Sequence, residues 1–144
     1  MPLVCRFKNS TRSFTRLYSW TALRDTRNRR APLDVHPEVE EALVNHRAVV
    51  ALETALVTHG LPYPSSLEVP LALEGIVRST GSIPATIGII DGRIKIGLEK
   101  DELRRLAERK YKPVKVSRRD IATAITTRSD GGVLDYSLPL PVLD

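Results

Sequence analysis

The chain has 144 residues, which is enough for one compact domain with a sizeable hydrophobic core. Apolar residues make up 42% of it and charged residues 27%, the composition of an ordinary soluble globular protein, and no apolar run approaches the roughly 18 residues that cross a bilayer. The single cysteine, Cys5, excludes an internal disulfide and a Cys-based metal site.

The formal net charge of +5 is concentrated in a flexible basic arm, residues 1–34. This segment holds eight Lys or Arg residues against two acids, a charge of +6, whereas residues 35–144 sum to −1. An arm rich in Arg and Ser and poor in acids is typical of a mitochondrial transit segment, so we expect a mitochondrial protein, otherwise a cytoplasmic one. A disordered tail that contacts phosphates nonspecifically is the alternative. The near-neutral remainder argues against nucleic acid as the partner, and no membrane partner is expected.

Residues 35–130 alternate between helix and strand signals. The first helix is expected to begin near Pro37, with His36 or Asp34 as its cap. Its apolar face is formed by Val39, Ala42 and Leu43. Residues 49–53 are a short apolar run typical of a buried strand. Thr58–Pro64, which contains one glycine and two prolines, is expected to be a loop.

A second helix is predicted over residues 67–80, ending at Gly81. Its expected inner face is formed by Val69, Leu73, Ile76 and Val77. Two apolar strands, residues 85–90 and 93–97, then flank Asp91-Gly92. An Asp-Gly pair between two such strands is the strongest short signal for a β-hairpin.

Residues 99–110 predict an amphipathic helix in which Asp101 and Arg105 can pair at i,i+4. Residues 114–116 predict a further strand, and Ser117-x-x-Asp120 has the spacing of a capping box before a helix over 121–127. The alternation predicts a mixed α/β domain. Residues 131–144 contain two prolines, which favour neither helix nor strand, and are interpreted as a divergent tail.

Glu53 is the first candidate for chemistry. It stands at the end of an apolar strand, where burial would raise the pKa of a carboxyl group and keep a proton available for donation. The alternative is a glutamate at a strand end that pairs with a nearby arginine. His59 follows in a loop with Gly60, where it could contact substrate, shuttle a proton, or merely order its own loop.

Lys115, Arg118 and Arg119 form the second candidate site. The two arginines stand at a predicted helix N-terminus, whose unpaired N–H groups and dipole attract anions such as a phosphate or phosphosugar. The alternative is a structural cluster in which Asp120 neutralises an arginine. No pair of His, Asp or Glu residues has metal-ligand spacing, so no metal ligand is assigned.

Three long segments stand in order: VVALETALVTHGLPYP over 49–64, GSIPATIGIIDG over 81–92 and KVSRRD over 115–120. Together they resemble the amino-terminal half of the pseudouridine-5'-phosphate glycosidases, also called the indigoidine synthase A-like family. The resemblance covers about half the chain and implies an α/β/α layered domain with a mixed sheet, here incomplete. It implies that Glu53 is the proton donor and that Lys115 contacts substrate. Thr54 and Ala55 replace a Ser and a Thr of the family motif.

The resemblance implies a reversible reaction that splits the C-glycosidic bond of pseudouridine 5'-phosphate, giving uracil and ribose 5-phosphate. Family members hold the opened ribose as a Schiff base on a lysine, use Mn²⁺ held by an aspartate, and assemble as trimers. Both that lysine and that aspartate lie beyond the point where this sequence departs from the family. We therefore expect a truncated form with little or no activity alone, and an exposed sheet edge that favours aggregation.

Two other hypotheses remain open from the sequence. A non-catalytic fragment could associate with a full-length homologue through its half-sheet. A small mitochondrial RNA-associated protein would bind RNA through residues 35–144, which their charge does not favour.

Overall fold

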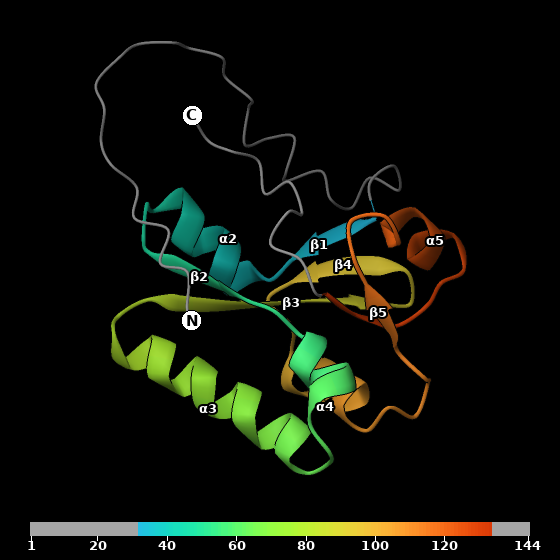
Figure 1. The fold of residues 1–144 in the computed structure, drawn as a ribbon. Helices are drawn as coiled ribbons and strands as arrows, with labels where there is room; N and C mark the ends of the chain where they lie inside the picture. Colours follow the sequence, from blue (N-terminus) through green and yellow to red (C-terminus); the bar gives the residue numbers. More distant parts are fainter. Residues whose placement is uncertain (1–31, 134–144) are drawn as a thin grey trace.

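The computed structural model describes residues 32–133 and shows a mixed six-stranded sheet with helices on both faces (Figure 1). The expected basic arm, apart from its last residues, and the tail beyond Val133 lie outside the described residues, so the transit-segment prediction is not tested. In chain order the elements are β1 (Leu33–Val35), α2 (Pro37–Val44), β2 (Val49–Leu52), η2 (Leu56–Gly60), α3 (Ser65–Ser79), β3 (Ile83–Ile90), β4 (Arg93–Ile96), α4 (Lys100–Ala107), β5 (Val114–Val116), α5 (Ile121–Thr126) and β6 (Gly131–Val133).

Strand β3 is the centre of the sheet, and all eight of its residues are buried. The strand order is β1-β4-β3-β6-β5, with β2 also paired to β3. Helices α2 and α5 cover one face, and α3, α4 and the short helix η2 cover the other (Figure 1). Because both faces are covered, β3 reads as a continuous apolar run. The predicted α/β/α layering with a mixed sheet is confirmed.

The core divides according to the two faces of β3. Odd-numbered residues of β3 face α2 and α5, where they pack with Val39, Ala42, Val116, Ala124 and Val133. On the other face Ile90 packs with Val57, Leu98, Leu103, Leu106 and Ala107. This alternation is the period of two that a strand imposes on its side chains.

The predicted hairpin is confirmed. Strands β3 and β4 pair antiparallel, with Ile90 opposite Arg93. Asp91 and Gly92 both have positive φ, 49° and 72°, as a two-residue turn of the I′ type requires. The cap of α2 is also confirmed: His36 Nδ1 accepts from the Glu38 N–H at 3.2 Å, and Pro37 occupies the first turn.

The inner face of α3 differs from the prediction. Val77 is buried as expected, but Val69, Leu73 and Ile76 are 39%, 42% and 61% exposed. The buried stripe instead contains Ser66 and Pro70, with Leu67, Leu71 and Glu74 partly covered. The pattern of apolar residues predicted the wrong face because polar residues of α3 can face the core when they are hydrogen-bonded there. Ser66 Oγ donates to the Ala107 carbonyl, and the Glu74 carboxylate accepts from the Thr86 hydroxyl.

Residues 58–64 are not entirely a loop. Residues 56–60 form one π-helical turn, η2, in which Val57 and Thr58 are buried and the Leu61 N–H donates to the Leu56 carbonyl. Gly60 and the prolines indicated a loop, whereas burial of Val57 in the core under α4 favours a helical turn.

Two short strands lie at the expected boundaries. Strand β1 pairs in parallel with β4, so Leu33 and Asp34 belong to the sheet and not to the arm. Strand β6 lies between β3 and β5, so Gly131–Val133 belong to the sheet and not to the tail. Both strands are only three residues long, and their pairing partners are distant in sequence, which explains why local patterns did not indicate them.

The predicted i,i+4 pair on α4 is wrong. Arg105 donates to Asp130, with Nε to Oδ2 at 2.7 Å and Nη2 to Oδ1 at 2.9 Å, while Asp101 pairs with Arg104. The Asp130 carboxylate, whose side chain is 3% exposed, also accepts from the Asp91 N–H. Asp130 is therefore the better partner, because it is buried and fixed by the turn of the hairpin.

Candidate functional site

The carboxyl ends of three strands meet at one edge of β3. Strand β2 pairs in parallel with the first half of β3 and ends with Leu52 opposite Thr86. Strand β6 pairs antiparallel with the second half of β3, with Gly132 opposite Gly88. Strand β5 lies on the other side of β6 and is parallel to it. Strands β2 and β6 therefore end facing each other near Ile87, and β5 ends beside them. Ligand sites in α/β sheets commonly lie where strand ends meet in this way.

Thr54 fixes this meeting point. Its hydroxyl donates to the Ile87 carbonyl at 2.7 Å and accepts from the Val133 N–H at 3.1 Å, and the residue is fully buried. One side chain thus connects the end of β2 to both β3 and β6. The motif position where the family resemblance implied Ser is filled by a residue that can make both bonds.

Glu53 lies between Leu52, the last paired residue of β2, and this buried threonine. It is half-buried. Within residues 32–133 its carboxylate makes neither an ion pair nor a hydrogen bond. The pairing with a nearby arginine, which the sequence left open, is therefore not formed among these residues, and the carboxylate is available to a ligand.

Lys115 emerges on the face of the sheet that η2 covers. It is paired with Gly132, and a side chain at Gly132 would collide with Thr58 Oγ1 at 2.2 Å and the Thr54 carbonyl at 2.6 Å. Paired residues on adjacent strands project to the same face, so the exposed Lys115 side chain stands beside η2. Val116, the next residue, points to the opposite face and is buried there.

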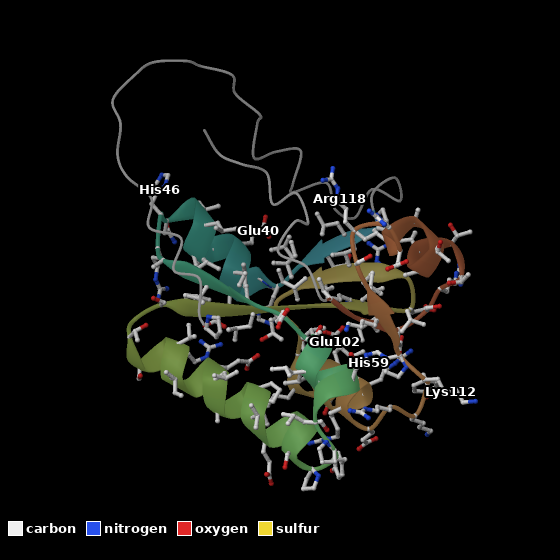
Figure 2. The ribbon with its side chains drawn as sticks, in the orientation of Figure 1. Glu40, His46, His59, Glu102, Lys112 and Arg118 are labelled. Carbon is white, nitrogen blue, oxygen red and sulfur yellow. The ribbon has the colours of Figure 1, made fainter. Side chains whose placement is uncertain are left out.

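His59 is on η2, and its Nδ1 atom lies 2.8 Å from the buried Thr58 hydroxyl. Burial and the nearby positive charges of Arg109 and Lys115 hold the pKa of His59 below its ordinary value. This contact ties the His59 ring to its own segment, and a role of His59 in substrate contact or proton transfer stays a prediction. Figure 2 shows His59 on η2, on the side of the sheet opposite to α2.

Arg118 and Arg119 precede α5, which is a short helix. Helix α5 has six residues, and Asp120, at its N-cap, makes no capping bond. Asp120 instead accepts from the Ser117 N–H and hydroxyl at 3.0 and 2.6 Å, half of the predicted capping box. Both arginines are exposed, and Figure 2 shows Arg118 on the side of α5, away from His59. The assignment of Arg118 and Arg119 to an anion site stays a prediction.

Arg109 was not predicted from the sequence. It follows α4 with a positive φ of 55°, and its Nη2 donates to the Leu61 carbonyl just after η2. With this backbone conformation the Arg109 side chain points toward η2. No local sequence pattern predicts this contact between two separate elements. The nearby Lys115 and Arg109 together make the surroundings of His59 basic.

A cavity of about 380 Å³ lies elsewhere, between α2, α3 and the start of α4, and is not lined by Glu53, His59 or Lys115. In it Arg78 pairs with Glu38, and Thr86 bonds to Glu74.

No three His, Cys, Asp or Glu side chains gather in residues 32–133. The most buried carboxylate among these residues, that of Asp130, is ion-paired with Arg105. The described residues thus do not fit a Mn²⁺ site. In the same part of the chain no helix has the length and apolar character needed to cross a membrane.

Comparison with known proteins gives a consistent result. Residues 38–134 match the family described as indigoidine synthase A like protein. The pseudouridine-5'-phosphate glycosidase of Clostridium botulinum is 46% identical over 99 residues, which cover 69% of this chain and 32% of the relative. The enzyme of the same name from Arabidopsis thaliana is 47% identical over 102 residues, covering 71% and 31%. The chain thus spans about a third of the length of these relatives.

Two solved structures share the fold. The prealnumycin C-glycosynthase AlnA in complex with ribulose 5-phosphate matches with a TM-score of 0.61 and 38% identity, over 71% of this chain and 32% of that one. An indigoidine synthase A-like protein from Thermotoga maritima matches with a TM-score of 0.54 and 29% identity, over 59% and 28%. The chain belongs to the indigoidine synthase A-like, or pseudouridine-5'-phosphate glycosidase, family and corresponds to part of its length.

Proposed function

We propose that this chain supplies the amino-terminal part of an enzyme that reversibly cleaves the C-glycosidic bond of pseudouridine 5'-phosphate to uracil and ribose 5-phosphate. Family membership and the names of the relatives support this reaction class. The ribulose 5-phosphate bound to AlnA supports a phosphorylated pentose as the substrate class.

The observation that carries the proposal is the meeting of β2, β5 and β6 at the buried Thr54 hydroxyl. Glu53 precedes this point and has no partner among residues 32–133, so its carboxyl group can transfer a proton to or from a substrate at the strand ends. Lys115, one strand beyond Gly132, supplies a positive charge for the phosphorylated sugar. No step is assigned to a metal, because the described residues do not form a site for one.

The chain by itself is expected to show no turnover, because it spans about a third of its relatives' length. Purified chain would be incubated with pseudouridine 5'-phosphate and Mn²⁺, and uracil would be measured by liquid chromatography. Uracil released at a rate similar to that of the Clostridium botulinum relative would contradict this expectation.

A chimera tests the role of Glu53. Residues 38–134 of this chain would replace the matching third of the Clostridium botulinum relative. The chimera is expected to release uracil, and Glu53→Gln should lower kcat by about 10²-fold or more, because a positioned proton donor contributes that much. Glu68→Gln, at an exposed position of α3, is the matched control. Equal rates for the two variants would refute the assignment of Glu53.

The exposed apolar face of α3 favours a second candidate, a non-catalytic fragment that binds a full-length family member. Val69, Leu73 and Ile76 recur at i, i+4 and i+7 on one helix face, and all three are exposed among residues 32–133. Co-purification with the full-length homologue is expected to be lost with Leu73→Glu plus Ile76→Glu. It should persist with Val44→Glu, an equally exposed apolar position on α2 across the sheet. Loss in both variants, or in neither, would exclude α3 as the binding surface.

A further inference from the structure

Three nitrogen-bearing side chains converge next to η2 from three different elements. His59 is on η2 itself, Arg109 follows α4, and Lys115 is on β5. Helix η2 contacts both α4 and β5. All three side chains are exposed, and within residues 32–133 none of them forms an ion pair with a carboxylate.

Two of the three side chains are held by hydrogen bonds, and the third, Lys115, is placed by the register of its strand. The Lys115 side chain leaves the sheet on the face where Thr58 packs over Gly132. Arg109 is held by the Leu61 carbonyl, one residue beyond the end of η2. His59 is held by the Thr58 hydroxyl. Arg109 and His59 are therefore oriented by a backbone carbonyl and a buried hydroxyl, respectively.

The hydrogen bonds of Thr58 fix which imidazole nitrogen is free. The hydroxyl has one proton, which it donates to the Thr54 or Ala55 carbonyl at 3.3 or 3.4 Å. It then accepts from His59 Nδ1–H at 2.8 Å. In this arrangement Nε2 is left for a ligand, from which it can take a proton or to which, once protonated, it can donate one.

Positive charges that gather without an acid destabilise one another, and an anion placed among them removes this repulsion. The pKa of His59 is lowered chiefly by burial of the ring, and the positive charges of Arg109 and Lys115 lower it further. A phosphate monoester carries close to two negative charges and three acceptor oxygens, which matches three donors from three directions.

We propose that His59, Arg109 and Lys115 form a subsite for the phosphate group of a phosphorylated sugar. The phosphate chemistry follows from the cluster alone, whereas the sugar rests on the proposed function. Arg109 is the part of the subsite that neither the motifs nor the resemblance indicated.

The full chain would be titrated with inorganic phosphate, ribose 5-phosphate and ribose, while the imidazole signals of His59 are followed by NMR. Both phosphates are expected to shift the His59 signals and raise its pKa, and ribose should do neither. Arg109→Gln should weaken phosphate binding about fivefold, the scale of one partly exposed charge contact. Lys100→Gln removes the same charge at the opposite end of α4 and should leave binding unchanged.

The outcomes separate this subsite from the reaction. Absence of a His59 response to either phosphate, equal loss in Arg109→Gln and Lys100→Gln, or tighter binding of an RNA oligonucleotide than of ribose 5-phosphate would each overturn the proposal. In the active chimera, Arg109→Gln should raise KM for pseudouridine 5'-phosphate about fivefold with kcat unchanged. If phosphate binds the chain as expected but the chimera releases no uracil, the subsite stands and the proposed function fails.

Discussion

Thr54 shows how one side chain can decide the geometry of a site. Its hydroxyl replaces the ladder hydrogen bonds that are missing where β2 and β6 end against each other on β3. Glu53 precedes this residue and η2 follows it, so the positions of both depend on the same two bonds. A hydroxyl is required here because only a group that both donates and accepts can satisfy a carbonyl and an N–H together.

The substitution Thr54→Val tests whether the two hydrogen bonds of the Thr54 hydroxyl join the strands. The substitution keeps the shape but leaves the Ile87 carbonyl and the Val133 N–H unpaired in the core, so the free energy of unfolding should fall by about 3 kcal/mol. Urea unfolding followed by circular dichroism measures it. Thr126→Val, which removes an exposed hydroxyl bonded to the Ala122 carbonyl, should change stability by less than about 0.5 kcal/mol. Similar losses in both variants would show that Thr54 does not join the strands.

At the scale of elements, the sheet and η2 can approach closely because β6 contains glycine. Gly132 lies under Thr58 and the Thr54 carbonyl, with no room for a Cβ atom. This contact sets how far η2, and with it His59, stands from Lys115. The packing of a helical turn on a strand is therefore part of the proposed site, although Gly132 has no chemical role.

Gly132→Ala is expected to destabilise the protein by about 2–3 kcal/mol or more, because backbone and a buried threonine must move. Gly75→Ala is the matched control, since a Cβ atom there meets nothing within 4 Å and Gly75 lies inside α3. It should stabilise by about 0.5–1 kcal/mol through helix propensity. Thermal unfolding of the two variants measures both signs, and a stabilising Gly132→Ala would contradict the close contact.

At the scale of the whole molecule, ion pairs connect elements far apart in sequence. Asp34 on β1 binds Arg93 and Lys95 on β4, and Glu38 on α2 binds Arg78 on α3. Hydrogen bonding to the arginines holds the pKa values of both carboxyl groups below their ordinary values. A carboxyl group with a lowered pKa contributes stability above its unfolded pKa, and this contribution is lost as the pH falls through the folded pKa.

Stability should therefore decrease below about pH 4.5, the region in which these carboxyl groups titrate when unfolded. His59 acts in the same direction at higher pH, because its lowered pKa makes the unfolded chain bind a proton first as the pH falls below about 6.5. Asp34→Asn plus Glu38→Gln should flatten the acid limb and cost about 1 kcal/mol in total at pH 7, given the partial exposure of both pairs. Urea midpoints at pH 3–7 measure this, and an unchanged slope would refute it.

An apolar stripe on α3 is exposed at the surface of the molecule. Three large apolar residues on one face of α3 are exposed among residues 32–133, and contiguous exposed apolar residues of this kind are typical of interaction surfaces. The expectation of an aggregation-prone product has the same origin and remains a prediction.

Patterns in the amino-acid sequence correctly predicted the family, the α/β class, the hairpin at Asp91-Gly92 and the helices α2, α3 and α4 within a few residues. These follow from local chemistry: positive φ at a turn, a cap before a proline, and the period of apolar side chains. The sequence also indicated Glu53, His59 and Lys115 as candidates, because motifs and charged residues next to apolar strands are visible without a structure.

Which helix faces are buried, and which side chains contact each other, depends on the packing of elements that are distant in the sequence. The inward stripe of α3 depends on partners for Ser66 and Glu74 that lie 41 and 12 residues away. The approach of Arg109 to His59 and the pairing of Arg105 with Asp130 likewise join separate elements. Long-range hydrogen bonds and close packing determine these contacts, and neither leaves a periodic signal in the amino-acid sequence.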